Sequence, residues 1–274
     1  GTYVYGGSTG TNYANPHAAT SINSVTNTYN KDGNLLTDGT VTNTWNYKDQ
    51  MTQTVNGGTT VNYLYDYGNN RSSYTDGTTT TDYANKYYNY NGAKKTKQIY
   101  AGDKLVATVE TVSAVVSPYY AHTDYLGSTS VVTNSSGALT QTLDYFPYGA
   151  ARISSGSYTG QRQFLSEVFD SDTSYNYLNA RYYSGSRAQF VSQDPVFVLM
   201  GDSVGIQLKT NHTLEQILRD PQLLNSYSYA RGNPIALTDG NGEFVDIPWI
   251  SNSRWVQEGA TALSDQSAAW RFSM

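Results

Sequence analysis

The stretch SYNYLNARYYSGSRAQFVSQDP, residues 174–195, decides how the rest of the chain is interpreted. It combines alternating or paired tyrosines with Arg181, Arg187 and the pair Asp194-Pro195. Alternating tyrosines favour β-strands, because the ring packs on a pleated surface while the hydroxyl stays solvated or hydrogen-bonded. The stretch is too short to be a domain, so its structural role must be inferred together with the sequence on either side of it.

The composition of the whole chain is typical of a β-rich secreted or surface protein. The chain has 274 residues, which is long enough to bury a sizeable core in one or two domains. Tyrosine occurs 26 times and only 14% of the residues are charged, so Thr, Ser, Asn and Gly supply most of the polar surface. Cysteine is absent, which excludes a disulfide framework and a thiolate metal site.

Charge and hydropathy exclude several classes of partner. The net charge of −5 and the pI near 5.1 predict no nucleic-acid partner, and the Lys94–Lys97 cluster is too short to reverse that prediction. No segment approaches the roughly 20 apolar residues of a membrane span, and the N-terminus lacks a signal-peptide pattern. His17 and His212 are isolated, so we predict neither a metal site nor a cofactor. We interpret the chain as an interior piece of a longer protein.

The first hundred residues repeat short alternating segments between turn sequences. Val41 to Tyr47 and Thr60 to Tyr65 alternate with period two, which predicts strands of an antiparallel meander. Glycine in each intervening turn supplies the positive φ that tight hairpins require. These turn sequences are Asp32-Gly33, Asp38-Gly39, Asn56-Gly57-Gly58, Asp76-Gly77 and Asn91-Gly92.

A longer phrase recurs at about twenty-residue spacing, which is typical of a repeat array. It stands at Tyr29–Leu35 (YNKDGNL) and Tyr63–Arg71 (YLYDYGNNR), with a degenerate copy at Tyr47–Asp49. Each unit would bury its tyrosine by stacking on the next unit, so we favour a structural role over a ligand-binding aromatic platform. The phrase resembles the YD repeats of Rhs and teneurin-type proteins.

The second half of the chain resembles the Rhs repeat-associated core domain. The matching segments, in order, are Tyr119–Ser128 (YYAHTDYLGS), Val131–Gly137, Asp144–Gly149 (DYFPYG) and the opening stretch. The resemblance implies a mostly β fold in which a YD-repeat antiparallel sheet spirals into a shell, or β-cocoon, that the Rhs core domain closes. It implies a YD-repeat meander over 1–118, the core domain over 119–242 and a variable C-terminal segment over 243–274.

Two local features have ordinary structural interpretations. His122 and Asp124 share a strand face but have no nucleophile beside them, so we favour a strand-and-turn role over acid–base catalysis. Residues 196–224 form an insertion with one predicted helix, capped by Asn211 or Thr213 and ended by Asp220-Pro221. We expect Leu214, Ile217 and Leu218 to form its packing face.

The resemblance also assigns a candidate site to the opening stretch. Family members close the shell with this segment and cut themselves with two carboxylates in an aspartic-protease-like arrangement, in which one ionised and one neutral carboxyl activate water and polarise the carbonyl. The two family aspartates correspond to positions 184 and 194. Asp194 is present, but Ser184 replaces the other. Arg181 is expected to hold Asp194 ionised, as a catalytic remnant or a closing salt bridge.

The expected cleavage region departs from the family pattern as well. It lies around Asp239, Gly242 and Glu243, where Gly240 replaces the usual proline and Glu243 stands in place of an apolar residue. Together with Ser184, these departures predict an uncut or slowly cut chain.

Two functions remain open from the sequence. The first is the C-terminal, shell-forming part of a secreted or cell-surface protein that encloses or displays an effector in toxin delivery and interbacterial competition. Its partner would be the rest of its own polypeptide or the enclosed effector, and self-cleavage would be its only enzymatic step. The alternative is a structural or adhesive surface protein that binds carbohydrate or assembles through exposed strand edges.

Overall fold

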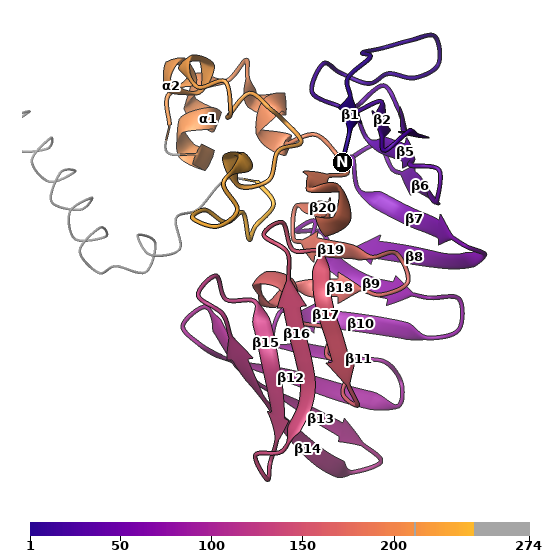
Figure 1. Cartoon of the computed structure of the whole chain (residues 1–274), viewed down its shortest axis with the longest axis vertical. Coiled ribbons are helices and arrows are strands. Elements are labelled where there is room, and N and C mark those ends of the chain that lie inside the picture. The colour runs from indigo at the N-terminus through magenta and orange to yellow at the C-terminus, as the bar shows by residue number, and fades with distance from the viewer. Residues whose placement is uncertain (211, 244–274) are drawn as a thin grey trace, which may run out of the picture.

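A continuous curved sheet dominates the computed structural model, which describes residues 1–210 and 212–243. Its 14 strands, β4 to β17, follow one another in sequence order, and each pairs antiparallel with the next. Figure 1 shows the sheet running from β5 to β14 and then turning back through β15 to β17. The strands are β4 Thr28–Tyr29, β5 Leu35–Thr37, β6 Val41–Trp45, β7 Met51–Asn56, β8 Thr59–Tyr65, β9 Arg71–Thr75, β10 Thr80–Asn85, β11 Tyr88–Tyr90, β12 Lys94–Ala101, β13 Lys104–Val112, β14 Val115–Thr123, β15 Thr129–Asn134, β16 Leu139–Tyr145 and β17 Ala151–Gly156.

The predicted meander is confirmed, and its physical basis is visible in β8. Val61 and Tyr63 are buried, whereas the intervening Asn62 and Leu64 are exposed, as one wet face and one packed face require. The hairpin glycines have the expected left-handed backbone, with φ of 83° at Gly39 and 88° at Gly77.

The opening stretch forms most of a second, four-stranded sheet. Its strands are β18 Val168–Asp170, β19 Tyr175–Leu178, β20 Arg181–Ser184 and β21 Gln189–Phe190, paired in that order. All residues of β19 and β20 are buried, so this small sheet is covered on both faces. A separate three-stranded sheet near the N-terminus contains β1 Tyr3–Val4, β2 Ser21–Ile22 and β3 Val25–Thr26.

Two clusters of buried side chains attach the small sheet to its surroundings. One cluster joins it to the first half of the long sheet through Tyr29, Leu35, Val41, Met51, Val61, Tyr63, Tyr74, Val168, Tyr175, Tyr177, Tyr182, Val191 and Tyr227. The other joins it to residues near the end of the long sheet and to the C-terminal segment through Phe164, Leu178, Tyr183, Phe190, Tyr229 and Ala230. The small sheet therefore lies inside a curved wall, which is a β-rich shell fold.

A buried cation fixes the joint between the two sheets. The guanidinium of Arg71 on β9 donates from Nη1 to Asp170 Oδ2 on β18 across 2.5 Å, and both side chains are almost fully buried. Tyrosine rings enclose the guanidinium at 4.5 to 5.9 Å, within the range of cation–π attraction. These rings belong to Tyr63, Tyr74, Tyr83, Tyr177 and Tyr182.

The insertion contains two helices within the described residues, where the sequence predicted one. The predicted helix is α2 (Leu214–Arg219), and Thr213 begins it with a capping box to Gln216. Its predicted packing face is partly wrong, because Ile217 is buried whereas Leu218 is 56% exposed. The second helix, α1 (Ser203–Thr210), contains a glycine and β-branched residues that weaken its sequence signal.

No helix among residues 1–210 and 212–243 has the length and apolar character of a membrane span.

The proposed domain limit at 118/119 falls inside β14, so the long sheet continues across it. The division into 1–118 and 119–242 stays a prediction, and the predicted variable segment lies outside the described residues from position 244 onward.

Candidate functional site

Arg181 lies at the centre of the candidate site. It begins β20 directly after a turn in which Asn179 has a positive φ of 58°, and its side chain is 2% exposed. Its Nη1 donates to the carbonyl oxygen of Ser226 across 2.9 Å, and its guanidinium lies 3.5 Å from the centre of the Phe190 ring. The cation is therefore held rigidly among buried groups.

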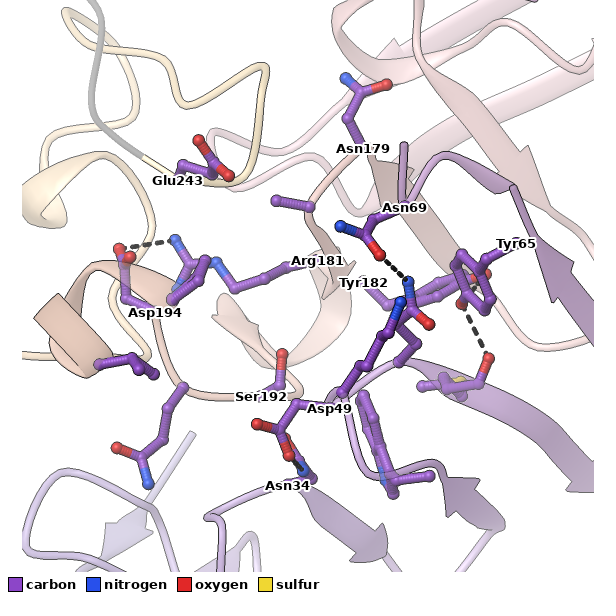
Figure 2. Close-up of a pocket in the computed structure, with 18 of the residues that line it drawn as sticks. Asn34, Asp49, Tyr65, Asn69, Asn179, Arg181, Tyr182, Ser192, Asp194 and Glu243 are labelled. Atoms are coloured by element: carbon purple, nitrogen blue, oxygen red, sulfur yellow. Dashed lines mark hydrogen bonds and ion pairs between the residues drawn. The ribbon is translucent and has the colours of Figure 1, made fainter. Parts of the chain in front are cut away.

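Two carboxylates share one nitrogen of this guanidinium. Arg181 Nη2 lies 3.0 Å from Asp194 Oδ2 and 3.2 Å from Asp239 Oδ2. Nε of the same guanidinium donates to the carbonyl oxygen of Gly242. We call Arg181, Asp194, Asp239 and Gly242 the Arg181 node. Figure 2 shows Arg181 reaching toward Asp194, with Glu243 nearby.

Asp194 is fixed by the turn that follows it. Its Oδ1 accepts a hydrogen bond from the Val196 amide across 2.9 Å and so caps the short helical turn Pro195–Leu199. Burial raises the pKa of Asp194, while Arg181 opposes this rise by favouring the charged form.

Asp239 is the more deeply buried carboxylate, with 1% of its surface exposed. Burial raises its pKa to about 6, against the opposing effects of Arg181 and of the nearby Gly242 and Glu243 backbone amides. Its Oδ1 has no hydrogen-bond partner within the described part of the chain. A carboxyl with such a pKa gains or loses its proton in mildly acidic solution.

The segment before Glu243 lies against the β19–β20 turn. Ala180 donates its amide to the Asn241 carbonyl across 3.1 Å, and Asn179 Nδ2 donates to the Gly240 carbonyl across 3.1 Å. Gly242 has φ of 70°, and a Cβ there would collide with the carbonyl oxygen of Leu178. We call residues 225–243 the strap.

The structure brings together most of the predicted site residues and adds a role for one of them. Arg181 and Asp194 pair as expected, and Gly242 from the expected cleavage region joins them. Ser184 has a separate environment, where its Oγ lies 3.2 Å from Ser186 Oγ. Asp239, expected only as part of the cleavage region, supplies the second carboxylate.

A small cavity adjoins both carboxylates. Its volume of about 30 Å³ gives room for a water molecule, and Asp194, Asp239 and Glu243 line it. The rest of its lining includes the apolar side chains of Val196, Phe197, Met200, Ile217 and Leu223.

A much larger cavity of about 890 Å³ opens beside the node, between the two sheets. Its walls are mainly polar, and Glu243 forms part of them. The side-chain amides that line it are those of Asn34, Gln50, Asn69, Asn70, Asn179, Gln193 and Asn241.

The histidines and carboxylates outside the node have the following positions. His122 Nε2 lies 3.2 Å from Thr133 Oγ1, whereas Asp124 Oδ1 accepts from the Ser128 amide, so the two side chains have separate structural partners. Among residues 1–210 and 212–243, no group of three or more His, Asp or Glu side chains is placed to hold a metal ion.

Comparison with known proteins supports an Rhs-like, β-rich fold. No family model matches the chain. Crystal structures of the TcdB2–TccC3 complex with Cdc42, and of the same complex without its hypervariable C-terminal region, superpose with TM-scores of 0.61 and 0.60. Both are 16% identical in sequence and cover 78% of this chain and 11% of the other.

Among curated proteins, the chain is similar to two tRNA nucleases. It is 27% identical over 241 residues to the tRNA3(Ser)-specific nuclease WapA of Bacillus spizizenii and 26% identical over 239 residues to the tRNA nuclease WapA of Bacillus subtilis. Each match covers 82% of this chain and 9% of the relative, so the chain spans less than a tenth of those proteins.

Proposed function

We propose that this chain is a wall and closure segment of a toxin-delivery shell that encloses a downstream effector in interbacterial competition. The similarity to WapA nucleases and the TccC3-like fold support a toxin context. The curved wall with the small sheet inside it suits enclosure. A secreted or cell-surface location goes with this role.

The nuclease activity in the names of the relatives belongs, in this proposal, to parts of a longer protein outside the wall. This chain has a net charge of −5, whereas a tRNA-binding surface needs clustered cations. We therefore assign the wall an enclosing role.

We further propose that the Arg181 node cuts the Gly242–Glu243 peptide bond. The observation that carries this proposal is the contact between Arg181 Nε and the Gly242 carbonyl, with two buried carboxyls on the same guanidinium. Arg181 polarises the carbonyl and stabilises the negative charge that develops on its oxygen during attack. In this proposal, Asp239 supplies the carboxylate that position 184 lacks. We therefore expect the chain to be cut, although the sequence predicted an uncut or slowly cut chain.

The proposed hydrolysis uses one water molecule and one carboxyl proton. Ionised Asp194 takes a proton from the water molecule while the oxygen of that water bonds to the Gly242 carbonyl carbon. Neutral Asp239, whose ionised form the nearby Glu243 backbone amide favours, gives its proton to the Glu243 nitrogen as the C–N bond breaks. The products are a carboxyl group on Gly242 and a new amino terminus on Glu243. The water-sized cavity beside both carboxylates suits this step.

Intact-mass spectrometry tests the proposed cut. We expect the purified chain to lose the segment from Glu243 onward during incubation at pH 5.5. Asp194→Asn and Asp239→Asn should each slow the cut about a hundredfold or more, because acid–base groups typically contribute that much. Asp103→Asn, in an exposed hairpin, is the matched control and should leave the rate unchanged. Cleavage that survives either node variant would contradict the proposal.

A further inference from the structure

The helical insertion contacts the strap at the residue that follows Gly242. Lys209 on α1 lies with Nζ 2.8 Å from Glu243 Oε1, and the two side chains are 35% and 31% exposed. Ile206 and Thr210 on the same helix are buried, so α1 is packed in place. The Glu243 amide donates to Asn241 Oδ1 across 3.0 Å. The backbone of Glu243 is therefore held by the strap and its side chain by the insertion.

We propose that Lys209 is a positioning residue that recognises the Glu243 carboxylate and seats the Gly242–Glu243 bond on the Arg181 node. This inference rests on the proposed self-cleavage and specifies its selectivity, namely an acidic residue after the cut. An acidic side chain at 243 brings a third carboxylate close to Asp194 and Asp239. A cation from the insertion offsets that charge, so the insertion and the acidic residue act as a pair.

The charges around Asp194 explain why this pairing affects chemistry as well as position. Asp194 faces Arg181 on β20, Lys209 on α1, and both Asp239 and Glu243 on the strap. Burial has the largest effect and raises the pKa of Asp194, whereas Arg181 and the Val196 amide lower it. Two smaller effects follow, because Glu243 raises this pKa and Lys209 lowers it. Removal of the Lys209 charge takes away one of the effects that lower the pKa of Asp194, so Asp194 remains protonated to a higher pH.

A charge-swap series tests the inference. Lys209→Glu and Glu243→Lys are each expected to slow cleavage about fivefold or more, because a partly exposed ion pair contributes a few-fold and reversal adds repulsion. The doubly swapped chain should recover to within about twofold of the original rate. In Lys209→Glu the limb of the pH–rate profile that reflects Asp194 should move to higher pH. Lys209→Arg should behave like the original chain.

A second measurement is independent of cleavage. In an Asp194→Asn background, hydrogen exchange of the strap amides around 239–243 should accelerate in either single reversal and slow again in the double swap. Lys104→Glu, at an exposed position on β13, is the matched control and should change neither rate.

The outcomes separate the two proposals. Cleavage that depends on Asp194 but is unchanged in the single reversals would overturn the role of Lys209 and leave the proposed cut intact. A chain that is never cut would overturn the proposed cut, while the exchange series would still decide whether Lys209 seats the strap. Failure of the double swap to restore both readouts would also overturn the inference.

Discussion

Arg71 is the residue that couples the long sheet to the small sheet. Its ion pair with Asp170 is buried, yet Arg71 Nε and Asp170 Oδ1 have no hydrogen-bond partners within the described residues. Burial of the pair costs free energy. Removal of one partner costs far more, because the remaining buried charge would be uncompensated.

We predict that Arg71→Met lowers the free energy of unfolding by about 3–5 kcal/mol, the range observed when one partner of a buried ion pair is lost. Arg71→Met combined with Asp170→Leu should be more stable than Arg71→Met alone, because no buried charge remains. Urea denaturation measures both values. Arg219→Met is the control, because its pair with Glu215 is exposed and should contribute less than about 1 kcal/mol. Equal stability of Arg71→Met and the control would contradict the role of the joint.

Glu167 makes stability depend on pH at a second joint. It pairs with Arg162 across 3.1 Å, and Arg162 in turn donates to the Lys86 carbonyl near the start of β11. Burial raises the pKa of Glu167 to about 7, against the opposing effects of Arg162 and Lys86. Because the folded chain binds this proton more tightly than the unfolded chain, the contribution to stability is complete below pH 4.5 and is lost as the pH rises to about 7.

The corresponding prediction concerns the difference between two pH values. Glu167→Gln should remove about 1–2 kcal/mol of the stability change between pH 5 and pH 8, the order of magnitude that a raised carboxyl pKa implies. Urea midpoints at both pH values measure this change, and Glu215→Gln on the exposed face of α2 is the control. An unchanged pH dependence in Glu167→Gln would show that Glu167 titrates normally.

At the scale of elements, the strap depends on the close approach of Gly242 to the β19–β20 turn. A methyl group there would collide with the Leu178 carbonyl, and the positive φ of 70° disfavours any other residue. We predict that Gly242→Ala displaces the Gly242 carbonyl from Arg181 and slows cleavage at least tenfold, since small misplacements near a reaction carry large rate costs. Gly240→Ala is the matched control, because a Cβ there meets open space. Equal cleavage of the two variants would contradict this seating of the strap.

The sequence predicted local elements better than their long-range contacts. Glycine turns and alternating tyrosines follow local rules, so the meander and α2 could be predicted from them. Arg71 and Asp170 stand 99 positions apart and Arg181 and Asp239 stand 58 apart, and no local pattern indicates that either pair meets. Helix α1 was missed because its stability comes from packing of Ile206 and Thr210, although Asp202 accepts from the Val204 and Gly205 amides at its start.

At the scale of the whole molecule, the chain is a curved antiparallel wall with a buried four-stranded sheet and a strap at its inner side. The small sheet contacts the first half of the long sheet through one cluster of aromatic residues and the strap through the other. The proposed enclosure therefore depends on the small sheet staying in place. A wall of this kind should protect whatever chain segment it encloses from proteases.

Limited proteolysis of a longer polypeptide that continues past Met274 tests the enclosing role most directly. We predict that the downstream segment resists a dose of protease that degrades the same segment produced alone, and that Arg71→Met, which loosens the joint, makes it sensitive while Arg219→Met does not. A downstream segment that is digested equally fast with and without the wall would contradict the enclosure.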